Sequence, residues 1–299
     1  MISLPYDAAP PWRVRGRYHL PMPDEPLTYA TYLKVPELLE LQASLSSPAH
    51  HDEALFIIIH QVYELWFKLI LHEVDTAGEE IEQDHVYEGT RLLRRVVEVQ
   101  RLLIHQVRIL ETMRPQDFLG FRYHLNPASG FQSIQFREIE FLLGLKNPAV
   151  LEHLVCDATE RQRLEARLTA PSVSDVFDAL LVRRGLGPPG APNAPSHAAA
   201  SGPSREEDWR VDALVRIYDD PEGQADLLAL CEVLIEIDEC LSLWRAHHVQ
   251  MVERMIGSLR GTGGSAGVAY LQSTLSKRAF PDLWRVRTRL GQEPEPAKG

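Results

Sequence analysis

Residues 221–257 read PEGQADLLALCEVLIEIDECLSLWRAHHVQMVERMIG, the longest stretch of this sequence with helical periodicity. Its large apolar residues recur at seven-residue spacing and form one seam, which a helix turns toward a core. The seam consists of Leu234, Ile237, Leu241, Trp244, Met251 and Met255. His248 occupies the seam position between Leu241 and Met255, so we expect its imidazole to point inward.

His248 has two interpretations. A lone histidine on an apolar face is most simply a core residue whose ring nitrogens are satisfied by hydrogen bonds. The alternative is an axial ligand to a buried metal or haem. A glycine cluster, GTGGSAG at 261–267, follows the helix and can bring backbone N–H groups close to an anionic group. The glycine cluster therefore keeps the axial-ligand interpretation of His248 open.

Helical periodicity dominates the rest of the chain and strand-like alternation is scarce, so we predict an all-α fold. Gly144 and Gly185 are typical helix stops. We expect the 299 residues to form a single-domain helical bundle (1–299) with a proline-rich N-terminal arm (1–26). The predicted helices span residues 52–73, 90–113, 131–143, 174–184, 206–218 and 224–256.

The segment 185–204 is rich in proline, glycine and alanine, a composition that buries too little apolar surface to order a chain. We predict a mobile surface loop there, with a domain linker as the alternative. No repeat or second domain is evident elsewhere.

Composition limits the partners and the compartment. With 31 basic and 42 acidic side chains the formal charge is −11, which disfavours nucleic acid as a partner. The N-terminus lacks a signal-peptide core, and the most apolar segment, 54–71, contains His60, Glu64 and Lys68, so we expect neither export nor membrane spanning. Three cysteines without CxxC spacing fit a reducing cytoplasm.

A second histidine stands out in the predicted helix 52–73. His60, Glu64, Lys68 and His72 recur every four residues and line one face. A polar stripe with a Glu64–Lys68 ion pair is the simplest explanation of that face. His60 lies at its most apolar end, beside Phe56 and Ile59, so a functional role is the alternative for His60.

Arg122 precedes the turn-rich stretch NPASG at 126–130 and is surrounded in sequence by phenylalanines. It is either an ion-pair anchor for a nearby acid or a planar fork for a ligand carboxylate.

Other motifs exclude common site classes. The glycine cluster contains GxGxxA, but it follows a helix and lacks a phosphate-binding lysine, so a nucleotide loop is disfavoured. Only Glu82 and His85 have ExxH spacing, whereas a di-iron bundle needs two such pairs. No HExxH zinc motif occurs.

Taken together, four ordered segments resemble the tryptophan 2,3-dioxygenase family, from about Leu27 to Thr288. They are HDEALFIIIHQVYELWFKLILHE (51–73), FRYHLNPASGFQSIQFREIEFLLG (121–144), LWRAHHVQMVERMIG (243–257) and GTGGSAGVAYLQSTL (261–275). The resemblance implies a helical bundle enclosing a b-type haem, ferrous in the active state.

The resemblance also assigns roles to the two histidines. His248 aligns with the proximal ligand of the haem iron, and His60 with the histidine that hydrogen-bonds the indole N–H and serves the catalytic site. Phe56 aligns with the aromatic residue that packs on the substrate ring.

Five further residues carry over by the same resemblance. Arg122 aligns with the arginine that binds the substrate carboxylate, and Thr262 with the threonine that holds the ammonium and carboxylate groups. Phe118 matches a substrate-side aromatic position, where some members have tyrosine. Ser129 and Gly130 match the wall of the haem pocket.

Tyr29, Tyr32 and Leu33 match residues that, in the family, reach into the substrate pocket of an adjacent subunit. The resemblance therefore implies a homotetramer with exchanged N-terminal arms.

The implied reaction inserts both atoms of O2 across the indole C2–C3 bond of L-tryptophan to give N-formyl-L-kynurenine, the first step of tryptophan degradation. The alternatives are a related haem oxygenase that hydroxylates a substituted indole or tryptophan analogue in secondary metabolism, and a haem sensor or carrier without turnover. Four positions depart from the family pattern near the pocket and bear on substrate identity: Ala54, Val62, His247 and Ala266. His247 lies about 100° around the helix from His248, so we expect it to face away from the haem.

Overall fold

The computed structural model describes residues 27–188, 208–262 and 267–291, and this part of the chain is helical with no strand. The predicted all-α fold is confirmed. Three predictions fall outside the described residues: the arm at 1–26, the part of the predicted loop from 189 to 204, and the departure at Ala266.

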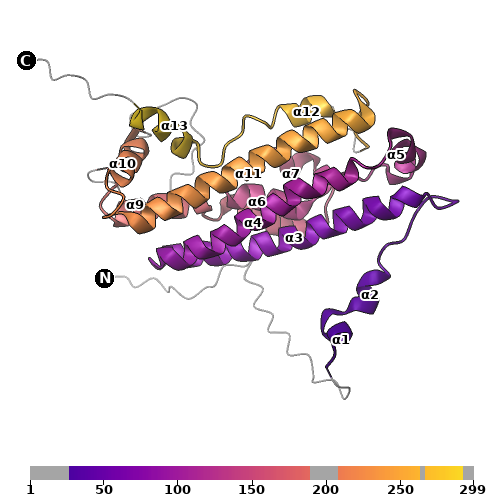
Figure 1. Cartoon of the computed structure of the whole chain (residues 1–299), viewed down its shortest axis with the longest axis horizontal. Helices are drawn as coiled ribbons and strands as arrows, with labels where there is room; N and C mark the ends of the chain where they lie inside the picture. Colours follow the sequence, from indigo (N-terminus) through magenta and orange to yellow (C-terminus); the bar gives the residue numbers. More distant parts are fainter. Residues whose placement is uncertain (1–26, 189–207, 263–266, 292–299) are drawn as a thin grey trace, which may run out of the picture.

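Three long helices run side by side and form the body of the molecule (Figure 1). They are α3 (His51–Glu82), α4 (Val86–Leu110) and α11 (Ala225–Ile256). The helix α4 packs extensively against both others. Ile81, Leu93 and Leu234, one from each helix, have no exposed surface. Burying each side chain stabilises the fold by roughly 1.5–3 kcal/mol, so apolar burial holds these helices together.

The helix α3 extends nine residues beyond the predicted end at Glu73. Its apolar face continues through Val74, Ala77 and Ile81, all buried, although the intervening residues are mostly polar. Because three buried positions per two turns are enough to hold a helix on a core, the polar composition did not end it.

The predicted start of the next helix at Thr90 is also wrong, because α4 begins at Val86. Gly89 lies inside its first turn, where an added Cβ would be 2.6 Å from Cγ1 of Ile81. The glycine therefore allows α3 and α4 to approach closely and does not mark a helix boundary.

The shorter helices cover the two ends and one side of this body (Figure 1). The turns η1 and η2 flank the 126–129 loop, and α6 follows η2 after one residue. The predicted helices 131–143, 174–184 and 206–218 correspond to α6, α9 and α10. The bounds are α5 (Pro115–Phe121), η1 (Arg122–Leu125), η2 (Gly130–Gln132), α6 (Ile134–Leu142), α7 (Val150–His153), α9 (Val173–Arg183), α10 (Asp208–Asp219), α12 (Val268–Gln272) and α13 (Pro281–Leu290).

One helix that periodicity did not predict, α8 (Ala158–Thr169), is held by ion pairs as well as by the buried Leu164. Arg167 makes a two-pronged contact with Asp75 of α3, and Arg163 pairs with the buried Glu138 of α6. Because its buried face is partly ionic, the apolar pattern of this helix is weak.

The N-terminal helices α1 (Tyr29–Leu33) and α2 (Val35–Leu39) extend away from the three long helices (Figure 1). The following chain is fixed to the start of α3 by Glu53, whose carboxylate accepts hydrogen bonds from the backbone N–H groups of Leu45 (2.6 Å) and Ser46 (3.1 Å). Burial raises the pKa of Glu53, but the hydrogen bonds from Ser46 and Leu45 outweigh it and leave that pKa lowered.

Among the described helices, α3 alone has the length and hydropathy of a membrane span, with a mean hydropathy of 1.6 over its most apolar window. Core helices show the same property, and α3 packs against α4, α6 and α9. The absence of a membrane-spanning segment stays a prediction.

Candidate functional site

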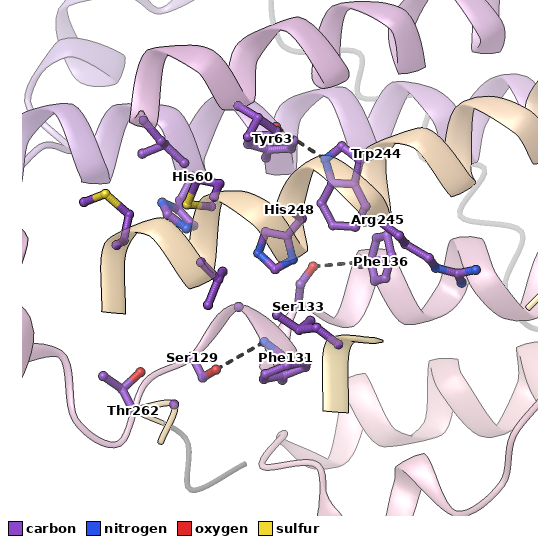
Figure 2. A pocket seen from close by; sticks show the side chains of 18 of the residues that line it. His60, Tyr63, Ser129, Phe131, Ser133, Phe136, Trp244, Arg245, His248 and Thr262 are labelled. Atoms are coloured by element: carbon purple, nitrogen blue, oxygen red, sulfur yellow. Dashed lines mark hydrogen bonds between the residues drawn. The ribbon is translucent and has the colours of Figure 1, made fainter. Parts of the chain in front are cut away.

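A cavity of about 260 Å³ lies among α3, α4, α5, α6, α11 and α12 and is bounded by the loops that follow α5 and α11 (Figure 2). Most of its wall is apolar, with a few converging polar groups, as in sites for small molecules and cofactors. Its apolar wall includes Phe56, Tyr63, Phe67, Val107, Leu110, Met113, Phe118, Phe131, Phe136, Trp244, Met251, Val252, Met255, Ile256, Tyr270 and Leu271. Its polar side chains are His60, Glu64, Arg122, Ser129, Ser133, Arg137, Glu140, Arg245, His248, Thr262 and Thr274.

His248 points from α11 into this cavity, as the apolar seam predicted (Figure 2). Neither ring nitrogen has a hydrogen-bond partner within the described residues, so the structure does not support a satisfied core histidine. Burial, and secondly the charge of His60, lowers the pKa of His248 to about 4. The imidazole is therefore neutral at physiological pH and keeps the lone pair that a metal ligand needs.

His60 lines the same cavity from α3. Its Nδ1 lies 2.7 Å from the carbonyl oxygen of Phe56. Because a carbonyl only accepts, Nδ1 carries the proton and Nε2 is left as an acceptor. Burial lowers the pKa of His60, although the Phe56 carbonyl and the charge of Glu64 raise it in part. A neutral acceptor thus faces the cavity.

The predicted Glu64–Lys68 ion pair is absent from the described structure. Glu64 instead accepts a hydrogen bond from Nε2 of Gln135 at 2.8 Å, because it faces α6 while Lys68 is exposed to solvent. The polar stripe is therefore not one solvated face.

Aromatic rings enclose the side of the cavity around His60. The Phe56 ring centroid lies 4.1 Å from that of His60 and 5.7 Å from those of Phe118 and Phe121. Phe118 and Phe121 meet edge to face at 5.5 Å. Such a wall favours a planar aromatic ligand and would keep water away from the faces of that ligand.

Arg122 is the first residue of η1 and lines the cavity. Its guanidinium donates a hydrogen bond to the backbone carbonyl of Arg260, which lies just after α11. No carboxylate of the described residues forms an ion pair with Arg122. The interpretation of Arg122 as an ion-pair anchor is therefore not supported within the described residues, and its positive charge remains available to a ligand.

Thr262 makes a second connection between the loop after α11 and the segment that follows α5. Its hydroxyl donates to the carbonyl of Ala128 at 2.6 Å. The Ser129 hydroxyl caps η2 by accepting from the N–H of Phe131 at 3.4 Å. Gly130 has no atom within 4 Å of the place where a Cβ would be, so it opens onto free space. Figure 2 shows Ser129 and Thr262 on the side of the cavity opposite α11.

Sequence reasoning missed a buried ionic cluster at the cavity wall. Glu140 of α6 accepts from Arg137 at 2.6 Å and from Arg245 of α11 at 2.8 Å. Arg245 also donates to the carbonyl of Lys277 at 3.2 Å. The i,i+3 spacing of Arg137 and Glu140 was a possible signal, but nothing in the sequence indicated that Arg245 completes the cluster.

The remaining predicted residues do not line this cavity. Tyr29 and Tyr32 are 79% and 72% exposed, and Leu33 is also exposed, so they are free to reach another subunit. Ala54, Val62 and His247, three of the departures from the family pattern, are also outside the cavity wall.

Comparisons with known proteins identify the family of this chain. The family model described as Tryptophan 2,3-dioxygenase matches residues 19–172 and 207–290. A tryptophan 2,3-dioxygenase of Nocardioides sp. is 46% identical over 270 residues, covering 88% of this chain and 95% of the relative. Proteins of the same name from Xanthomonas oryzae and Xanthomonas campestris are 43% and 42% identical over 273 residues, covering 91% of each chain. The chain belongs to the tryptophan 2,3-dioxygenase family.

Proposed function

We propose that this protein is a haem-dependent dioxygenase that inserts both atoms of O2 across the C2–C3 bond of L-tryptophan and forms N-formyl-L-kynurenine. The observation that carries the proposal is the convergence, on one cavity, of side chains from four separate segments of the chain. These are His60, Arg122, His248 and Thr262.

A b-type haem would be held with the neutral imidazole of His248 supplying a nitrogen ligand to its iron. The imidazole is neutral, lacks a competing hydrogen bond within the described residues and is set in apolar surroundings. Gly130, beside Ser129, leaves room where any other residue would place a Cβ. When bound, the haem supplies the activation of O2, which no amino-acid side chain provides.

Arg122 and Thr262, which lie in the segments after α5 and α11, suit the polar end of an amino acid. The Arg122 guanidinium would bind the substrate carboxylate through two parallel hydrogen bonds, the strongest geometry for such a pair. Because the Thr262 hydroxyl donates its proton to the Ala128 carbonyl, its oxygen would accept a hydrogen bond from the substrate ammonium, beside the carboxylate. Together they would hold the substrate in one orientation, which is how a fixed geometry lowers the barrier.

The indole ring would lie against Phe56 and Phe118, with its N–H directed to Nε2 of His60. Because Nδ1 of His60 is engaged by the Phe56 carbonyl, Nε2 is the atom free to accept. An indole N–H is too weak an acid to lose its proton early, so His60 would position the ring more than it acts as a base.

We further propose a homotetramer in which Tyr29, Tyr32 and Leu33 enter the pocket of an adjacent subunit. Their exposure and the projection of α1 from the body support this arrangement (Figure 1). The net charge of −11 supports the absence of a nucleic-acid partner, and the unpaired cysteine count supports a cytoplasmic location.

The test is a product analysis. The haem-loaded protein is reduced under argon, mixed with L-tryptophan and air, and the product mass is measured. A product heavier by two oxygen atoms supports the proposal. A product heavier by one atom would favour hydroxylation, which no observation here favours, and a haem spectrum with no product from tryptophan or substituted indoles would favour a carrier.

A further inference from the structure

The ring of His248 lies parallel to the indole ring of Trp244, one helical turn earlier on α11. Their centroids are 5.2 Å apart and the rings are inclined by only 5° (Figure 2). Residues four apart on a helix share a face, so this stack is built into the helix itself.

Trp244 is in turn connected, through the hydroxyl of Tyr63, to the helices α3 and α4. Its Nε1 donates to the hydroxyl of Tyr63 on α3 at 3.4 Å, and that hydroxyl donates to the carbonyl of Leu103 on α4 at 2.7 Å. The dashed line in Figure 2 marks the first of these contacts. Burial raises the pKa of Tyr63 to about 12, so the phenol keeps the proton that it donates to Leu103.

Histidines that bind metals are usually oriented by a hydrogen bond from their second ring nitrogen to a carboxylate or carbonyl. His248 has no such bond within the described residues. Glu140, a nearby carboxylate at the cavity wall, is already engaged by Arg137 and Arg245. Within the described residues, the stack on Trp244 is the ring-to-ring contact of the His248 imidazole.

We propose that Trp244 and Tyr63 are positioning residues that set the plane of the His248 imidazole, and with it the direction in which its nitrogen would meet an iron. This inference rests on the proposed haem ligation by His248. It concerns how the ligand is held, which neither family membership nor the ligand's identity determines.

Three substitutions separate the contributions. Trp244→Leu removes the stack, Trp244→Phe keeps a flat ring but loses the N–H donor, and Tyr63→Phe removes only the hydroxyl. The matched control is Trp284→Phe, because the Trp284 indole also donates to a buried acceptor, Asp238, at 2.9 Å, but lies outside the cavity wall.

The measurements are the iron–histidine stretching band of the oxygen-free ferrous protein and the Kd for haem. We expect Trp244→Leu to broaden or split the band and to raise the Kd about 10- to 100-fold, the usual range for residues that orient metal ligands. Trp244→Phe and Tyr63→Phe should shift the band with smaller changes in Kd. Trp284→Phe should lower the Tm and leave the band in place.

The inference is overturned if Trp244→Leu keeps the wild-type band and Kd while losing as much Tm as Trp284→Phe. If Trp244→Leu does not fold, an unshifted band in both phenylalanine variants overturns it instead. A wild-type protein without any iron–histidine band would contradict the ligation by His248 itself, so the two failures are distinguishable.

Discussion

The two sides of the cavity are built differently. His60 and His248 stand on long helices that are held in place by the buried face of each helix. Arg122 begins the short turn η1 and Thr262 lies in the loop after α11, and these two segments, the loop side of the cavity, are joined through the backbone carbonyls of Arg260 and Ala128. Rigid elements give precision and loops give adjustable contacts. In the proposed function, the helix side therefore fixes the two imidazoles, His248 toward the cofactor and His60 toward the substrate ring, whereas Arg122 and Thr262 select the polar end of the substrate.

The largest expected effect tests the helix side. His248→Ala should abolish stable haem binding, because no other described side chain of the cavity replaces the axial nitrogen on α11. The measurement is the haem content after gel filtration, together with the ferrous spectrum. His247→Ala is the matched control, since its neighbouring imidazole lies outside the cavity wall. Equal haem contents in the two variants would refute the ligand assignment.

The second effect concerns how the helix side is held together. Glu140→Ala leaves the buried guanidiniums of Arg137 and Arg245 without their shared carboxylate, and breaking such a pair costs about 3–5 kcal/mol of the free energy of unfolding. Denaturant unfolding of the protein measures it. The surface pair Glu98–Arg101 supplies the control, because Glu98→Ala should cost less than about 1 kcal/mol. A similar loss in both would mean that the buried cluster contributes no more than a surface pair.

The third effect tests the loop side. Arg122→Ala should raise the KM for L-tryptophan about 100-fold, or about 2.7 kcal/mol, because a charge-assisted contact to the substrate is lost. Binding of 3-methylindole, which has no carboxylate, should stay within about twofold, since the aromatic wall is unchanged. Arg114→Ala, at an exposed arginine paired with Asp117, is the control. Equal losses for both ligands would return Arg122 to a structural role.

The same contrast explains what the sequence could predict. The seam of α11 placed His248 in the cavity, because a helix repeats its direction and one inward position follows from its neighbours. The end of α3 was misplaced because its buried face continues through Val74, Ala77 and Ile81, and the start of α4 was misplaced because Gly89 serves close packing there and not a boundary. The helix α8 was missed because its buried face is partly ionic.

The loop side could not be derived from periodicity. Arg122 and Thr262 are 140 residues apart in the sequence, and their proximity depends on hydrogen bonds to backbone carbonyls that any residue type supplies. Spacing alone left Arg122 with two interpretations, and only the family resemblance predicted its role. Trp244 was recognised as a core residue, but its stack on His248 depends on ring orientation, which a pattern of apolar positions does not specify.

The smallest effect sharpens the comparison, because it removes a single hydroxyl from the loop side. Thr262→Val keeps the shape of the side chain but loses the bond to the Ala128 carbonyl, so we expect kcat/KM for L-tryptophan to fall about tenfold, or about 1.4 kcal/mol. The Tm should barely change, because both groups lie near solvent. Thr274→Val is the control in the same cavity, since its hydroxyl bonds only to the nearby carbonyl of Leu271 at 2.7 Å. If the two valine variants lose equal activity, the tie between the loops does not position the substrate, and Arg122 alone selects it.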